Sequence, residues 1–100
     1  MTELANRFLD DAQRIATSEA WGTAGWQEIA LAYGGPTRHY HNLQHLQNLF
    51  RLFGEYQSQL QEPEVVSWTI WYHDIIYNAK RKDNELRSAQ LARQRLQQTT

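Results

Sequence analysis

Apolar residues recur along most of the chain at the three- and four-residue spacing of one helix face, and nowhere do they alternate with polar residues as in a half-buried strand. Residues 3 to about 19 form the first expected helix. Its apolar residues share one stripe: Leu4, Phe8, Ala12 and Ile15. The stretch 21–23 interrupts this pattern. A second helix is expected from about 23 to 33, and Gly-Gly-Pro at 34–36 ends it, because proline cannot continue a helix.

The second half of the chain predicts three more helices. One is expected over about 40–60, with His45 inside its apolar arc and His41 at the edge of that arc. The next, over 63–77, has proline in its first turn and is apolar on all sides, which is typical of a buried helix. A fifth spans about 83–98, with a narrow apolar stripe. The expected fold is therefore all-α, with about five helices in a single domain over residues 1–100.

Composition narrows the possible classes of function. Of the 100 residues, 41% are hydrophobic, so the chain can bury a modest core. A formal net charge of -1 provides no basic field to attract a nucleic acid polymer or an anionic membrane. Cysteine is absent, so a transition metal would have to bind through histidine and carboxylate. The first residues do not resemble a signal peptide, and no apolar run is long enough to span a bilayer, which fits a cytoplasmic location.

All four histidines lie in two short patches, residues 38–45 and residues 70–77. Three of them, together with Asp74, are expected on apolar helix faces: His41, His45 and His73. Neutral imidazoles and a carboxylate bind divalent transition metals at neutral pH, and the ion compensates the charge of a buried carboxylate. The alternative is that these histidines belong to the core, each satisfied by a hydrogen bond. The chain would then be a non-catalytic helical module for binding or oligomerisation.

Three motifs carry a resemblance to a known family. Residues 40–45 read Tyr-His-Asn-Leu-Gln-His, residues 71–74 read Trp-Tyr-His-Asp, and residues 84–89 read Asn-Glu-Leu-Arg-Ser-Ala. In this order they resemble the HD superfamily of metal-dependent phosphohydrolases, especially a bacterial subfamily of small predicted HD-superfamily phosphohydrolases. The first motif also occurs in cyclic-nucleotide phosphodiesterases. The resemblance covers roughly residues 30–90. It implies an HD-domain-like helical bundle that hydrolyses a nucleotide or another small phosphorylated metabolite.

The resemblance also implies roles for individual residues. The metal ligands would be His45, His73 and Asp74, with Asp74 catalytic as well, and the divalent ion would be Mn, Fe, Co, Ni, Zn or Mg. His41 has two alternative roles. It is the first ligand if the motif is counted as Arg-x-x-His, or the general acid if the phosphodiesterase-like motif applies, and the four-residue spacing to the next histidine favours the acid. Arg38 would bind a phosphate oxygen of the substrate.

The chain departs from the family pattern in one respect. The family's site is completed by an aspartate on a later helix, whereas no Asp or Glu follows Glu85 here. We therefore expect this chain to be inactive, either as a truncated N-terminal part of a longer enzyme or as a shortened protein that has lost catalysis. Open apolar helix faces would then favour homo-oligomers. A third interpretation is a metal-stabilised regulatory domain that binds nucleotide without cleaving it.

Overall fold

A computed structural model describes residues 2–16, 18–36, 38, 40–78 and 80–99 of the chain. Over these residues it contains α-helices, one short 3₁₀ helix and no strand, which confirms the all-α prediction of about five helices. The elements are, in order, α1 (Thr2–Gln13), α2 (Glu19–Tyr33), α3 (Leu43–Tyr56), the 3₁₀ helix η1 (Gln57–Gln59), α4 (Pro63–Tyr72) and α5 (Asn84–Gln97).

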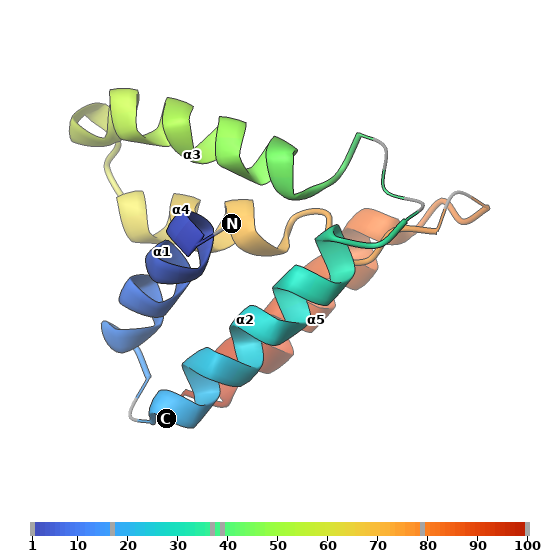
Figure 1. Cartoon of the computed structure of the whole chain (residues 1–100), viewed down its shortest axis with the longest axis horizontal. Coiled ribbons are helices and arrows are strands. Elements are labelled where there is room, and N and C mark those ends of the chain that lie inside the picture. Colours follow the sequence, from blue (N-terminus) through green and yellow to red (C-terminus); the bar gives the residue numbers. More distant parts are fainter. Residues whose placement is uncertain (1, 17, 37, 39, 79, 100) are drawn as a thin grey trace.

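The helices form two antiparallel pairs, with α1 packed across both (Figure 1). One pair is α2 with α5, and the other is α3 with α4. Because α3 and α4 run in opposite directions, the beginning of α3 and the end of α4 lie at the same end of the pair. The two histidine patches, far apart in the sequence, are therefore brought to one place by the topology alone.

Trp71, in the last turn of α4, occupies the centre of the core and is fully buried. Its ring centroid lies 4.3 Å from that of Phe50 on α3 and 5.2 Å from that of Phe8 on α1. Trp26 on α2 lies 6.3 Å away. Aromatic contacts from three helices thus fix the last turn of α4, and with it the position of the His-Asp motif that follows.

A buried carboxylate joins α1 to α4. Asp11 accepts hydrogen bonds from the Ser67 hydroxyl at 2.7 Å and from the Trp71 indole N–H at 2.9 Å. Arg14, one turn further along α1, forms an ion pair with the same carboxylate. Because every buried charge needs partners, this network specifies the rotation of α4 about its own axis.

The predicted boundary between the first two helices is wrong. We expected the first helix to reach about residue 19 and the stretch 21–23 to interrupt the pattern. Instead, α1 ends at Gln13, and α2 begins at Glu19 with Ser18 as its N-cap, whose Oγ accepts the Ala20 N–H at 3.1 Å. Gly22 and Gly25 lie inside α2, where they allow it to approach α1 closely.

The predicted third helix is also shorter in the structure than in the sequence pattern. Asn42 is the N-cap of α3, so His41 lies before the helix, and the last residues of the expected segment form η1. The fifth helix agrees with its prediction to within about a residue at each end.

Candidate metal centre

The beginning of α3 is built around Asn42. Its side-chain oxygen accepts the His45 N–H at 3.0 Å, which satisfies one of the free amides of the first turn. His45 therefore lies in the first turn of α3, while His41 lies in the preceding loop. Although no helix places them one above the other, their ring centroids are only 5.9 Å apart.

The end of α4 is set by Tyr33, the last residue of α2. Its hydroxyl donates to the Trp71 carbonyl and accepts the Asp74 N–H, both at 3.1 Å. Burial raises the pKa of this tyrosine well above its usual value, so the hydroxyl stays protonated and can donate. The prediction of a helix over 63–77 is therefore wrong at its end. α4 stops at Tyr72, because tertiary hydrogen bonds take over the backbone groups that a further turn would use.

Arg38 holds the two segments of the site together. Its guanidinium donates to the carbonyls of His41 at 3.1 Å, Asp74 at 2.7 Å and Ile75 at 2.8 Å. It also lies over the ring of Tyr33, with 5.1 Å between the guanidinium carbon and the ring centroid. Burial lowers its pKa from the ordinary arginine value, and the neighbouring Asp74 opposes this shift. The geometry gives Arg38 a positioning role, while its expected contact with substrate phosphate stays a prediction.

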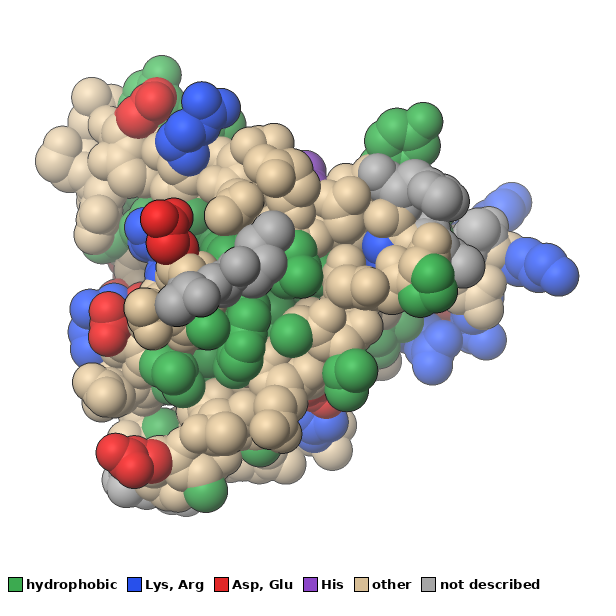
Figure 2. All heavy atoms as spheres, in the orientation of Figure 1, with side chains coloured by type: hydrophobic (Ala, Val, Ile, Leu, Met, Phe, Trp, Pro, Cys, Tyr) green, Lys and Arg blue, Asp and Glu red, His purple; other side chains and the backbone are tan. Residues whose placement is uncertain are grey.

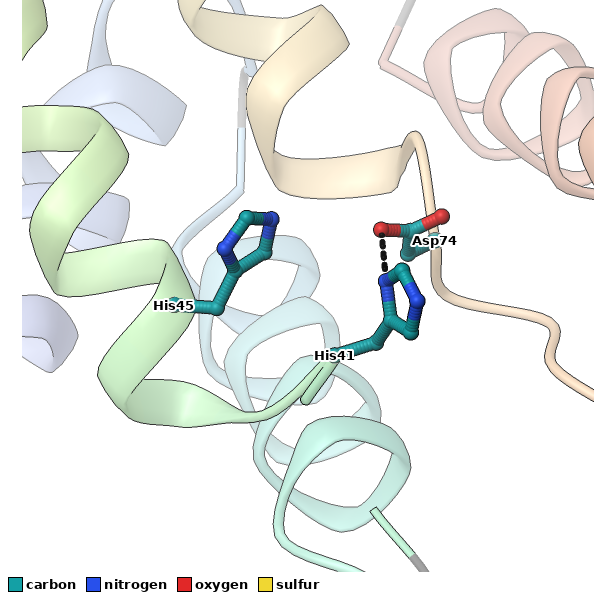
Figure 3. Close-up of side chains that lie close together, drawn as sticks. All are labelled: His41, His45 and Asp74. Atoms are coloured by element: carbon teal, nitrogen blue, oxygen red, sulfur yellow. Dashed lines mark hydrogen bonds and ion pairs between the residues drawn. The ribbon is translucent and has the colours of Figure 1, made fainter. Parts of the chain in front are cut away.

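Four side chains converge between these segments: His41, His45, His73 and Asp74, which we call the His-Asp cluster. Asp74 Oδ2 lies 2.8 Å from His41 Nδ1 and 2.8 Å from His73 Nε2. His41, His45 and Asp74 each offer one ligand atom, and these atoms lie within 4.8 Å of one another (Figure 3). Two ligand atoms of a tetrahedral Zn²⁺, each about 2.1 Å from the ion, lie about 3.4 Å apart, so binding requires these side chains to move together by up to about 1.4 Å.

The hydrogen bonds of His73 leave one nitrogen for coordination. Nδ1 lies 2.7 Å from the Ile70 carbonyl, which can only accept, so Nδ1 carries a proton and donates it. Nε2 lies 2.8 Å from Asp74 Oδ2, and because both atoms present lone pairs, this contact requires a proton or a metal ion between them. A metal-binding histidine is commonly oriented by a backbone carbonyl in this manner.

His45 is held in the neutral form that a ligand needs. Burial lowers its pKa below the usual histidine value, and the nearby His73 and His41 act in the same direction. Asp74 opposes the shift but does not cancel it. The ring of His45 also faces that of His73, at a centroid distance of 5.7 Å. A proton therefore competes less with a metal ion at this imidazole than at a solvated one.

The His-Asp cluster lies at the surface rather than in the core. The exposed side-chain fractions are 43% for His41, 31% for His73 and 21% for Asp74. This exposure differs from the desolvated surroundings expected for a helix that is apolar all round. A substrate could reach the cluster directly, and the exposure does not favour the alternative in which the histidines are core residues.

Four charged residues that follow the His-Asp motif in the sequence lie outside the cluster. Lys80 and Lys82 are exposed, and Arg81 between them forms a two-pronged ion pair with Asp83, at 2.9 and 3.0 Å. Glu85 is exposed in the first turn of α5. None of these four residues belongs to the group of side chains that could bind a metal ion in the His-Asp cluster.

Two residues of the site were missed by the sequence analysis. Tyr33 falls at the end of the second expected helix and has no predicted role in the site, yet its hydroxyl ends α4. Tyr77 stacks on the ring of His41 at a centroid distance of 5.3 Å and an interplanar angle of 27°. For Tyr77, the one signal in the sequence is its position close after the His-Asp motif. Neither the contact of Tyr33 with Asp74 nor that of Tyr77 with His41 follows from the sequence, because each depends on how the helices pack.

Comparison with known proteins gives no match for this chain to a protein-family model, a curated protein or a solved structure. The resemblance to the HD superfamily thus remains a prediction based on the three motifs. Over the described residues, none of the helices combines the length and apolar character needed to cross a membrane.

Proposed function

We propose that the His-Asp cluster is the metal centre of a phosphohydrolase of the HD type, acting on a phosphoester of a nucleotide or another small phosphorylated metabolite. The observation that carries this proposal is the convergence of three imidazoles and one carboxylate from two segments distant in the sequence. The three sequence motifs support it independently.

The donor set fits a divalent transition metal. Imidazole nitrogens with one carboxylate suit Mn, Fe, Co, Ni or Zn, whereas Mg²⁺ prefers an all-oxygen set. In our proposal His45, His73 and Asp74 hold the ion, as the sequence motifs imply. His73 lies 2.8 Å from Asp74, but the group whose ligand atoms all lie within 4.8 Å of one another consists of His41, His45 and Asp74. When bound, the ion supplies a Lewis acid for a phosphoryl oxygen and lowers the pKa of a coordinated water.

His41 is proposed as the proton donor to the leaving oxygen. Its Nδ1 faces Asp74 Oδ2 at 2.8 Å, and the Tyr77 ring stacks on its face. A carboxylate at Nδ1 fixes the ring and favours a proton on that nitrogen, so Nε2 is the atom left to exchange a proton with a substrate. The same residue could instead be a metal ligand, since its ligand atom belongs to the close group with His45 and Asp74.

This chain is expected to be inactive, although it should bind the ion. The family pattern calls for another carboxylate, and no acidic residue follows Glu85. Appending a segment that supplies this carboxylate should raise metal-dependent hydrolysis of a phosphomonoester. Hydrolysis that survives both His73→Ala and Asp74→Ala would contradict the proposed mechanism.

Bound metal, measured by mass spectrometry on the purified chain, tests the site itself. We expect close to one ion per chain in the parent, and a loss of that ion in His45→Ala and in Asp74→Ala. Gln44→Ala is the matched control, because Gln44 is an exposed neighbour of His45 that bonds only weakly, at 3.3 Å, to Asn48. Equal metal content in all four proteins would show that the metal is bound elsewhere.

A further inference from the structure

A groove between α3 and α4 opens directly beside the His-Asp cluster. It is shallow and open, with a volume of about 360 Å³, and is lined by His45, Leu49, Val66, Thr69, Ile70 and His73. We call it the α3–α4 groove. Leu49 lies one helical turn after His45, and Ile70 lies nearly one turn before His73, so aliphatic side chains continue the surface that the two imidazoles begin.

The walls of the α3–α4 groove carry no charged side chain. Leu49, Val66 and Ile70 are all partly exposed, so each has apolar surface left to cover. The hydroxyl of Thr69 donates to the Val65 carbonyl at 2.8 Å, which uses its only proton. The polar groups that remain are the two imidazoles, at the end nearest the cluster, and the Thr69 oxygen, which can still accept a hydrogen bond.

We infer that the α3–α4 groove binds the uncharged, apolar organic group of the phosphoester, such as an aromatic ring, while the phosphate lies at the His-Asp cluster. This inference rests on the proposed function and narrows its substrate class. A second phosphate or a carboxylate among the aliphatic side chains, away from the two imidazoles, would lose part of its hydration and find no cationic side chain there, which is unfavourable. An aromatic ring would instead cover the exposed parts of three aliphatic side chains.

Two phosphonates that cannot be hydrolysed as esters test the inference without any need for turnover. Phenylphosphonate and methylphosphonate carry the same charged group but differ in the apolar part. Calorimetric titration of the Zn²⁺-loaded chain should show phenylphosphonate binding about tenfold more tightly, the ratio expected from burying most of one ring face. The metal content of each sample is measured first.

Substitutions in the α3–α4 groove should remove this preference while leaving the metal in place. Leu49→Gln should bring the two affinities to within about twofold and leave methylphosphonate binding unchanged. The reason is that the phenyl ring would then cover a polar amide in place of an apolar side chain. Val66→Thr, which keeps the side-chain shape, should have a smaller effect in the same direction. Leu52→Gln is the control, since Leu52 is an exposed leucine of α3, 46% accessible, that does not line the groove.

Each negative result has a distinct meaning. Failure of the chain to bind metal overturns the proposed function, and this inference with it. Metal binding with equal affinity for the two phosphonates, or a preference unchanged by Leu49→Gln, overturns the groove assignment alone. A parent that is a dimer by light scattering, becomes a monomer in Leu49→Gln and shows no phenyl preference would identify the groove as an interface between copies of this chain.

Discussion

Arg38 shows how one side chain can organise a site without belonging to its ligand set. Its guanidinium contacts carbonyls on both sides of the His-Asp cluster, those of His41, Asp74 and Ile75. A planar fork of donors can satisfy several acceptors at fixed angles, which the single ammonium of lysine cannot do. The relative position of His41 and Asp74 therefore depends on a residue that the sequence suggested for phosphate binding.

Replacing Arg38 should cost folding stability as well as function. We expect Arg38→Ala to lower the free energy of unfolding by about 2 kcal/mol, because three charge-assisted hydrogen bonds to partly buried carbonyls are lost. Urea unfolding measures this change, and Arg51→Ala, at an exposed position of α3, is the control. If Arg38 instead serves only the substrate, phosphonate affinity will fall while the urea midpoint stays constant.

His45 should make the stability of the metal-free chain depend on pH. Its pKa in the folded chain is below the ordinary value of 6.5, so the unfolded chain binds the proton more tightly. The associated stability is complete above about pH 6.5 and is lost as the pH falls through the lower, folded pKa. Urea midpoints at pH 7.5 and pH 5, with a chelator present, should fall further in the parent than in His45→Gln. Equal losses would exclude this contribution.

At the residue scale, the sequence predicted which residues would form the His-Asp cluster, but not the contacts that hold them in place. The sequence identified all four members of the His-Asp cluster, because histidine and aspartate in two short motifs indicate a metal site. Nothing in the sequence specified that Tyr33 would accept the Asp74 N–H, since that bond requires α2 to end beside α4. The role of Arg38 likewise requires two segments that are about 36 positions apart in the sequence to lie next to each other in the fold.

At the scale of elements, apolar periodicity predicted the number of helices, but neither all of their ends nor the burial of every apolar face. The fourth helix was expected to be buried all round, yet Val65 of α4 is 58% exposed. The end of α5 followed from local signals, while α4 stops early because Tyr33 and Arg38 take its next backbone groups. Between the first two helices, the stretch 21–23 suggested a break because Gly22 within it is a poor helix former, whereas Gly25 was expected inside the second helix. In the structure they are selected by close packing against α1, which no local pattern reveals.

A pair of glycine substitutions tests that explanation. A methyl group at Gly25 would lie 2.8 Å from an atom of the Phe8 ring, whereas one at Gly54 in α3 would meet nothing within 4 Å. Gly25→Ala should therefore destabilise the fold by about 1–3 kcal/mol through overpacking. Gly54→Ala should stabilise it by up to about 1 kcal/mol, since alanine favours the helix. Thermal unfolding of both variants measures these changes. Stabilisation by Gly25→Ala would contradict the explanation that Gly25 is needed for close packing of α2 against α1.

On the scale of the whole molecule, the five helices are held together by different kinds of contact. Helices α1 to α4 share the aromatic core around Trp71, whereas only Ser88 of α5 is fully buried. Figure 2 shows apolar side chains gathered on the face where α1, α2 and α4 meet, with charged groups around its edge. α5 contributes the partly buried Leu91, Ala92 and Leu96 to this core, and polar contacts add to its attachment. Ser88 bonds the backbone of Ile76, and Arg95 forms a two-pronged ion pair with Glu28 on α2, at 2.9 and 2.7 Å.

Since few apolar side chains anchor α5, we expect this helix to detach before the rest of the chain unfolds. Native-state hydrogen exchange should give its amides a lower opening free energy than those of α3. Arg95→Ala should increase exchange in α5 about tenfold, the effect of losing a partly buried two-pronged ion pair, and leave α3 nearly unchanged. Arg93→Ala, at an exposed position on the same helix, is the control. Exchange of α3 and α5 at one common free energy, rising together in Arg95→Ala, would mean that the chain opens as a single unit and that the His-Asp cluster is lost whenever α5 is released.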